Sequence, residues 1–172
     1  PSPNGRTNYY WLDLNRDWLP HQHPETRALL ELFHDWKPNV QLDFHEQGSN
    51  RNYFFMPGVA ERTFALIPRV NQDLTAAITL FNEKKFDEHG TLFFTREGFD
   101  DFYVGKGSTY PDLFGCVGIL FEQPSSRGLK QRVTGGELTF ADSITNQFRA
   151  SLSSIEGVAA LKSKLLEYQS DH

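Results

Sequence analysis

The stretch V-G-I-L-F-E-Q, residues 117–123, places five apolar or small residues in a row directly before an ionisable one. A run of this kind predicts a strand that is buried on both faces, as strands of a parallel sheet are. The stretch V-Q-L-D-F-H, residues 40–45, alternates apolar and polar side chains and predicts a strand that stops at His45. Residues 92–95 predict a third strand.

Helical patterns separate and follow these strands. Residues 24–36 predict a helix that begins with a proline and ends before Pro38. Its apolar residues are spaced at i, i+3, i+4 and i+7, and they are Leu29, Leu32, Phe33 and Trp36. Residues 62–86 predict a second helix, which Pro68 kinks or divides. One long helix closes the chain, with apolar residues at helical spacing over residues 144–165.

Strands that alternate with helices predict a three-layer α/β fold, in which helices flank a mixed, largely parallel sheet. In such folds the functional residues gather at the carboxyl ends of the strands. His45 and Glu122 each come directly after a predicted strand. We therefore expect these two side chains to lie together in one site.

Length, charge and cysteine content limit the possible functions. The chain has 172 residues, which predicts a single domain over residues 1–172. Its net charge is −5 and its longest basic cluster is Lys84-Lys85, which argues against a nucleic-acid partner. Cys116 is the only cysteine, so a disulfide or a thiolate zinc site within the chain is excluded. No apolar run approaches ~18 residues, so we expect no membrane span.

A second motif lies near the beginning of the sequence, where residues 6–18 read R-T-N-Y-Y-W-L-D-L-N-R-D-W. Arginine suits the binding of a carboxylate because its planar, permanently charged fork donates two parallel hydrogen bonds. An isolated N-R pair is more often part of a surface turn. Here the pair belongs to a longer motif, and the helix and strand that lead to His45 follow it.

Residues 6–18 closely resemble the carboxylate-anchoring stretch of the carboxypeptidase A-like zinc metallopeptidases, in which R-x-N precedes D-L-N-R by this spacing. L-D-F-H-E around His45 and G-I-L-F-E-Q around Glu122 resemble that family's third zinc ligand and its catalytic glutamate. Together with G-K-G-S-T-Y-P-D at residues 105–112, the pattern resembles a bacterial branch of the family. The resemblance covers nearly the whole chain and implies a zinc carboxypeptidase-like fold.

The resemblance also implies an activity, namely zinc-dependent hydrolysis of the C-terminal peptide bond of a peptide. Asn15 and Arg16 would bind the substrate's terminal carboxylate, and Arg6 would stabilise the oxyanion. His45 would be one of three zinc ligands. Glu122 would be the general base that takes a proton from the attacking water and passes it to the leaving amine. A periplasmic or secreted location is the compartment that the resemblance suggests.

The family also has a mobile tyrosine that closes over the substrate, upstream of its catalytic glutamate. Tyr103, in D-D-F-Y-V-G-K-G, matches it best, and Tyr110 is the second choice. Gly105 and Gly107 would allow such a loop to move. The same segment also reads as an ordinary turn before a short helix that starts at Tyr110, and the two interpretations are compatible.

The first two zinc ligands of the family lie on an H-x-x-E motif upstream of D-L-N-R, and these 172 residues contain no H-x-x-E. We therefore expect the chain to be the C-terminal part of a catalytic domain, incomplete at its N-terminal side. The missing ligands would come from an upstream segment of the same protein or from a separate chain. By itself the chain is expected to bind zinc weakly or not at all and to show little activity.

Some residues have an alternative interpretation. His21, His23 and Glu25 lie close together in the sequence and could complete a zinc site with His45, although H-x-H in a loop is a weak signal. Glu46 is either a hydrogen-bonding partner of the site or a solvated acid.

Two other points stay open from the sequence. Arg127, in S-S-R-G, is either a further substrate contact or a loop arginine. Two other functions remain: a zinc amide hydrolase or deacylase of the same fold, and a non-catalytic module that binds peptide C-termini.

Overall fold

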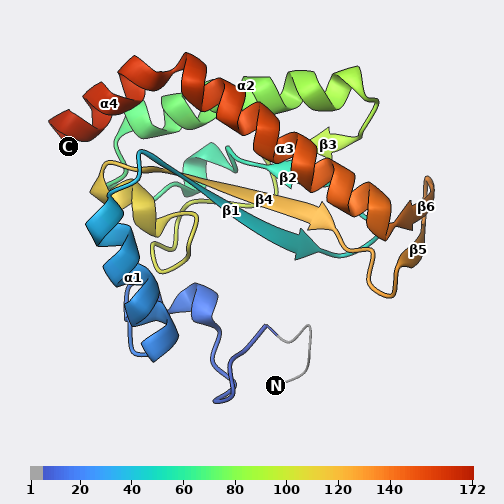
Figure 1. Cartoon of the computed structure of the whole chain (residues 1–172), viewed down its shortest axis with the longest axis horizontal. Coiled ribbons are helices and arrows are strands. Elements are labelled where there is room, and N and C mark those ends of the chain that lie inside the picture. Colours follow the sequence, from blue (N-terminus) through green and yellow to red (C-terminus); the bar gives the residue numbers. More distant parts are fainter. Residues whose placement is uncertain (1–5) are drawn as a thin grey trace.

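The computed structural model describes residues 6–172 and has a four-stranded main sheet (Figure 1). The strand order is β1-β4-β2-β3, with β1 at Val40–Gln47, β4 at Val117–Pro124, β2 at Tyr53–Phe55 and β3 at Phe93–Phe94. β1 is parallel to β4 and β2 is parallel to β3, whereas β2 runs antiparallel to β4. The prediction of a mixed, largely parallel sheet is confirmed.

Helices lie on both sides of this sheet (Figure 1). One side is covered by α2 (Arg69–Glu88), α3 (Phe140–Ala160) and α4 (Lys162–Asp171), and α1 (Pro24–Trp36) lies on the other. The remaining elements are the 3-10 helices η1 (Leu14–Arg16), η2 (Ala60–Arg62) and η3 (Tyr110–Phe114), and the hairpin of β5 (Lys130–Val133) and β6 (Gly136–Thr139). The three-layer α/β arrangement agrees with the prediction.

Aromatic side chains form most of the core between the sheet and α2. Phe55, Phe86 and Phe121 are fully buried, and Phe121 stacks on Phe44 with ring centroids 4.5 Å apart. Burial of each such ring contributes roughly 2–3 kcal/mol. This packing fixes the position of β4 relative to β1.

A second, smaller cluster joins α1 to η3. Its buried members are Trp18, Leu30, Phe33, Tyr110 and Cys116. Because Trp18 lies two residues after the end of η1, this cluster holds the segment that contains D-L-N-R against the same face of the sheet as α1.

Both strands that carry the expected site residues are longer than the sequence predicts. The β1–β4 pairing continues to Gln47 and Pro124, so His45 and Glu122 lie within their strands, two residues before the ends. The expectation that they directly follow the strands was wrong. The pairing of β1 with β4 continues past their apolar runs. Where such pairing ends cannot be seen from the residue pattern of one strand alone.

Helix limits also differ from the predictions. Residues 62–68 are mostly non-helical, because Pro68 adopts extended dihedral angles (φ −62°, ψ 144°) and α2 begins only after it. The closing helix is not continuous, since Leu161 (φ −100°, ψ 9°) separates α3 from α4. The sequence patterns predicted neither β2 nor the β5–β6 hairpin.

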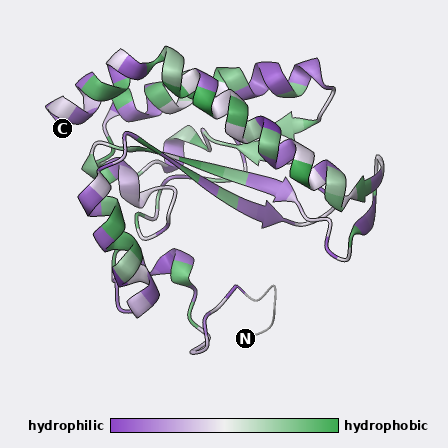
Figure 2. Cartoon of the chain, viewed as in Figure 1, coloured by the Kyte–Doolittle hydropathy of each residue, from purple (hydrophilic) through white to green (hydrophobic). Residues whose placement is uncertain are grey.

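Figure 2 shows hydrophobic segments along α1 and α3. Most members of their apolar stripes are exposed, although Phe33 on α1 is buried. Trp36 on α1 is 80% exposed and Phe148 on α3 is 62% exposed. The inner face of α3 is small and polar instead, and Ser153 and Ser154 pack on α2 through hydrogen bonds with Asn82. Small residues let two helices approach closely. The apolar stripe of α3 therefore did not indicate which of its faces is buried.

Candidate functional site

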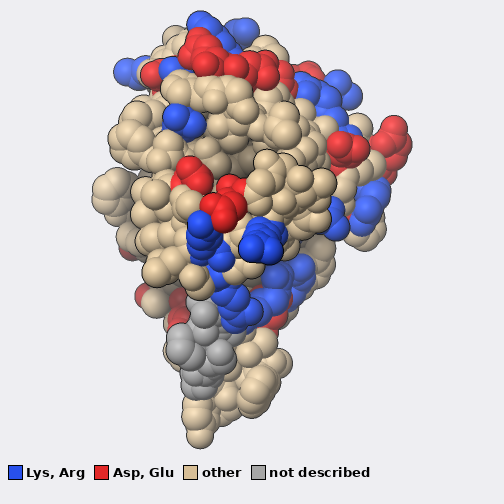
Figure 3. Space-filling model, turned by 90° about the vertical axis from the view of Figure 1, so that its right-hand side faces the viewer, with Lys and Arg blue, Asp and Glu red and all other residues tan. Residues whose placement is uncertain are grey.

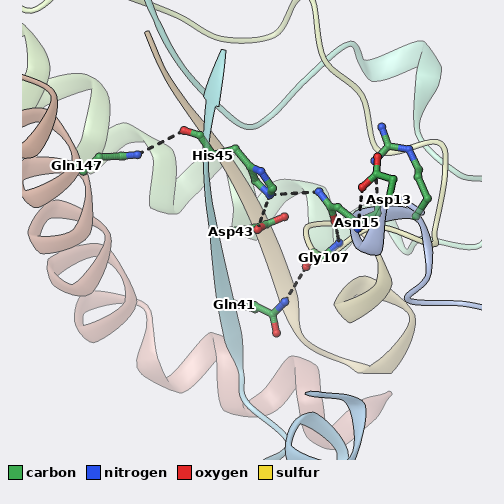
Figure 4. Close-up of polar contacts among 8 residues, drawn as sticks. Asp13, Asn15, Gln41, Asp43, His45, Gly107 and Gln147 are labelled. Atoms are coloured by element: carbon green, nitrogen blue, oxygen red, sulfur yellow. Dashed lines mark hydrogen bonds and ion pairs between the residues drawn. The ribbon is translucent and has the colours of Figure 1, made fainter. Parts of the chain in front are cut away.

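His45 and Glu122 are neighbours in the sheet. They are paired residues of β1 and β4, so their side chains project from the same face. Asp43 and Gln41 lie on this face too, because alternate residues of a strand point to the same side (Figure 4). This is the side of the sheet on which α1 and η1 lie.

The D-L-N-R motif forms η1, and Asp13 organises it. Asp13 Oδ1 accepts a hydrogen bond from the Asn15 backbone N–H at 2.9 Å, which caps the short helix. Asp13 Oδ2 accepts a hydrogen bond from Arg6 Nε at 2.6 Å. The motif therefore places Arg6 beside η1 and turns the Asn15 side chain toward the sheet (Figure 4).

The Asn15 side chain joins three segments of the chain. Its Nδ2 lies 3.2 Å from His45 Nε2, and its Oδ1 accepts a hydrogen bond from the Gly107 N–H at 2.7 Å. The Gly107 carbonyl in turn accepts a hydrogen bond from Gln41 Nε2 at 2.7 Å (Figure 4). Residues from η1, β1 and the loop before η3 therefore meet around His45.

One nitrogen of the His45 ring is held by a carboxylate. Nε2 lies 2.8 Å from Asp43 Oδ1, and the hydrogen bond to Asp43 is the main reason that the pKa of His45 is raised. Nδ1 has no hydrogen-bond partner among residues 6–172. With the proton on Nε2, the Nδ1 lone pair is free, which is the arrangement typical of metal-binding histidines with a carboxylate behind the ring.

Glu122 is a half-buried acid beside His45. Burial raises its pKa, while the positive charges of His45 and Arg6 act in the opposite direction. Its Oε2 is buried and lacks a hydrogen-bond partner within the described part of the chain. A carboxylate whose pKa is moved toward neutrality, with one oxygen free, is suited to accept and return a proton.

The expected substrate-binding residues lie around η1. Arg16 is exposed, and its Nη1 donates to the Asn15 carbonyl oxygen at 2.6 Å. The Tyr103 hydroxyl donates to the Arg16 carbonyl oxygen at 2.8 Å. Tyr110, the second choice for the closing tyrosine, is buried, and its hydroxyl lies 3.0 Å from His34 Nε2 on α1.

The sequence patterns did not identify Asp43 and Lys106. Asp43 could have been found, because a carboxylate two residues before a histidine on a strand must share its face. Lys106 is partly buried in the loop before η3, and burial lowers its pKa. Its charge acts on Glu122 and on Asp43, and the G-K-G sequence alone gives no sign of this proximity.

The described residues do not form a complete zinc site. Within residues 6–172 no group of three or more His, Cys, Asp and Glu side chains is arranged to hold a metal ion. His21 and His23 contact Leu19 and Asn8 instead of His45. His45 therefore fits one ligand position, and the set of His21, His23 and Glu25 with His45 is not assembled.

A cavity of about 410 Å³ lies beyond the ends of β1 and β4. Glu46, Arg127 and Phe140 line it, and Glu46 Oε2 accepts a hydrogen bond from Ser125 Oγ at 3.0 Å. Glu46 thus has a hydrogen-bond partner at the end of β4 and does not contact His45 through any hydrogen bond of the described residues. Figure 3 shows acidic and basic side chains next to one another on the side of the molecule at which these strands end.

None of the helices formed by residues 6–172 combines the length and the hydropathy that a membrane span requires.

No protein-family model matches the sequence, and no curated protein matches it. Two solved structures are similar to the chain. A metallo-carboxypeptidase from Burkholderia cenocepacia superimposes with a TM-score of 0.67 and 19% identity, over 91% of this chain and 40% of that one. A Burkholderia mallei protein described as a carboxypeptidase gives a TM-score of 0.68 and 18% identity, over 90% and 41%. The chain spans about two fifths of the length of these structures, and its fold is that of a bacterial metallo-carboxypeptidase over the matched part.

Proposed function

We propose that these residues belong to a zinc-dependent metallocarboxypeptidase, which removes the last residue of a peptide. The observation that carries the proposal is the pairing of His45 with Glu122 on adjacent parallel strands, directly opposite η1. The pair combines a potential metal ligand with a half-buried carboxylate, and the D-L-N-R motif adds charged and amide donors beside it.

Substrate binding is the task of η1 in this proposal. Arg16 and the Asn15 amide donate hydrogen bonds to the terminal carboxylate, and Arg6 stabilises negative charge that develops on the scissile carbonyl oxygen. Arg6 already acts electrostatically on both His45 and Glu122, which supports its place beside the reacting groups. Tyr103 lies next to Arg16 and can close over the bound residue.

Proton transfer is the task of Glu122. Its free Oε2 takes a proton from the attacking water and delivers it to the amine that leaves. Zinc, when bound, makes water more acidic and polarises carbonyl groups. His45 Nδ1 would be one of its ligands, and Asp43 holds the ring so that this nitrogen faces away from the carboxylate.

The other zinc ligands would come from polypeptide outside these 172 residues. Two observations support this part of the proposal: residues 6–172 contain no group of three metal-binding side chains, and the chain spans about two fifths of the similar structures. Zinc titration by calorimetry tests it. We expect weak or no binding to the 172-residue chain, whereas one tightly bound zinc that is lost in His45→Ala would refute it.

Activity is tested in the natural protein that carries these residues, with a peptide that has a free C-terminus and its C-terminally amidated form. Glu122→Gln should abolish turnover but retain zinc and peptide binding. Arg16→Ala should mainly raise KM for the free peptide, and Arg132→Ala, on the exposed hairpin, serves as the matched control. An equal loss on both peptides would contradict the role of Arg16.

The same assays separate the two other functions. A deacylase of this fold would hydrolyse N-acyl amino acids in preference to peptides, because such substrates also present a carboxylate. A non-catalytic module would bind free C-termini without turnover, and Glu122→Gln would then have no effect on its only activity. The half-buried carboxylate of Glu122, whose pKa is raised by burial, favours hydrolysis, since a module that only binds does not need it.

A further inference from the structure

The loop of residues 103–107 is fastened to residues 15–18 at three points. The Tyr103 hydroxyl donates to the Arg16 carbonyl oxygen at 2.8 Å, and the Trp18 N–H donates to the Gly105 carbonyl oxygen at 3.1 Å. The third contact is the hydrogen bond from the Gly107 N–H to Asn15 Oδ1 at 2.7 Å. The first uses the Tyr103 side chain, and only the last reaches a side chain that contacts His45.

The Gly107 contact determines how the Asn15 amide is turned. A backbone N–H can only donate, so the atom of Asn15 that faces it must be the carbonyl oxygen Oδ1. The NH₂ group of Asn15 then points at the His45 ring, where Nδ2 lies 3.2 Å from Nε2 (Figure 4).

The His45 ring does not use this NH₂ group. Nε2 also lies 2.8 Å from Asp43 Oδ1, and one ring nitrogen cannot donate to a carboxylate and accept from an amide at the same time. An ionised carboxylate can only accept, so the shorter, charge-assisted contact requires Nε2–H to donate to Asp43. Asn15 therefore keeps both amide hydrogens available beside His45.

A glycine suits this close approach of the loop. A Cβ on residue 107 would lie 3.0 Å from Asp43 Oδ2 and 3.0 Å from Trp18 Cζ2, and Gly107 is buried between them. Trp18 is held by the cluster that joins α1 to η3, and Asp43 is held by its contact with His45. A larger residue would therefore move the N–H away from Asn15.

We propose that Gly107 is a positioning residue: its N–H holds the Asn15 amide so that Asn15 presents donors, and no acceptor, to a carboxylate ligand at His45. The identity of that ligand as the terminal carboxylate of a peptide rests on the proposed function. The orientation of the amide does not, because it follows from the hydrogen bonds alone.

Amide hydrogen exchange and NMR of the 172-residue chain test the orientation. In Asn15→Leu, exchange at the Gly107 N–H should accelerate about tenfold, because the loss of one buried hydrogen bond has about this effect. In Asn15→Asp it should stay within about twofold of the parent, since a carboxylate still accepts from the N–H. Unchanged exchange in Asn15→Leu, or nuclear Overhauser contacts that place the Asn15 NH₂ at Gly107, would overturn the proposal.

Two controls exclude a general effect on the fold. Exchange at the core amides of β4 should equal that of the parent in both variants. Gln41→Leu, which removes the bond to the Gly107 carbonyl and leaves its N–H bonded, should leave the orientation of the Asn15 NH₂ unchanged. A changed orientation of the Asn15 NH₂ in Gln41→Leu, with the Gly107 N–H still protected, would show that the loop as a whole, and not the N–H, sets it.

The donor role is tested with N-acetylphenylalanine and its C-terminal amide as probes in the same NMR experiments. The parent should bind the carboxylate probe more tightly than the amide probe. In Asn15→Asp the ratio of the two affinities should fall by about tenfold or more, while the exchange rate of the Gly107 N–H stays close to that of the parent. Equal binding in Asn15→Asp and the parent would refute the donor role. A parent that holds the Asn15 amide as described but binds neither probe would refute carboxylate capture in the proposed function, with the orientation still supported.

Discussion

Replacing Asp101 with asparagine tests how one buried carboxyl makes the free energy of unfolding depend on pH. Asp101 is 2% exposed, and its Oδ1 accepts a hydrogen bond from Thr109 Oγ1 at 3.1 Å. Burial raises the pKa of this carboxyl from 3.8 to about 6, and the nearby Lys106 opposes the rise only in part. The two pKa values differ by about 2 units, and each unit corresponds to about 1.4 kcal/mol. The carboxyl can therefore change the free energy of unfolding by about 3 kcal/mol.

The sign follows from the direction of the shift. A raised pKa means that the folded protein holds this proton more tightly than the unfolded chain does, so its stabilising effect is complete below about pH 4 and is lost as the pH rises through about 6. Asparagine does not titrate. Relative to the parent, Asp101→Asn should therefore gain up to about 3 kcal/mol in the free energy of unfolding between about pH 4 and about pH 7.

Urea unfolding followed by tryptophan fluorescence, at about pH 4, 5.5 and 7 and constant ionic strength, measures this difference. Asp73→Asn is the control, because Asp73 pairs with Arg69 at 2.9 Å on the exposed surface of α2. The free energy of unfolding of this variant should change with pH in parallel with that of the parent. Asp112, which is also buried with a raised pKa, keeps part of the pH dependence in the variant. Parallel curves for the parent and Asp101→Asn would refute the argument.

Three further changes test the fold around the site. Tyr53→Phe removes the hydroxyl that donates to Gln147 Oε1 at 2.5 Å and should lower the free energy of unfolding by about 1–2 kcal/mol in urea titrations; no change would mean that water replaces the bond. Gly118→Ala places a Cβ against the Ser108 carbonyl oxygen and should cost about 3 kcal/mol or more, seen as a large fall in Tm, so a parent-like Tm would contradict the close packing. Thr139→Ala breaks the capping box of α3 and should cost about 1 kcal/mol in thermal unfolding, which Thr139→Ser should largely restore.

Local pattern was sufficient for the elements that carry the site. The apolar run before Glu122 and the alternation before His45 predicted β4 and β1, and the motif of residues 6–18 singled out Asn15, which the structure places at the short helix η1. These predictions succeed because a strand buried on both faces and a capped turn each require particular residues within a few positions.

Helix faces were harder to predict. The apolar stripe of α3, which contains Phe148, is exposed, and the helix packs through Ser153, Ser154 and Gly157 instead. Small residues carry little hydrophobic signal, although Gly157 lies against Phe81 so closely that a Cβ would be 3.1 Å from its ring. Periodicity identifies a helix, but the neighbouring helix determines which face is buried.

The sequence by itself determined which residues have the chemistry for a site: His45, Glu122 and the asparagine and arginine of D-L-N-R. Only the tertiary structure decided their partners. Asn15 meets Gly107 across 92 positions of sequence, and Asp43 holds His45 within a strand whose full length was set by its pairing with β4. Residue types follow from the chain alone, whereas hydrogen bonds between distant segments form only after packing has brought those segments within about 3 Å of one another.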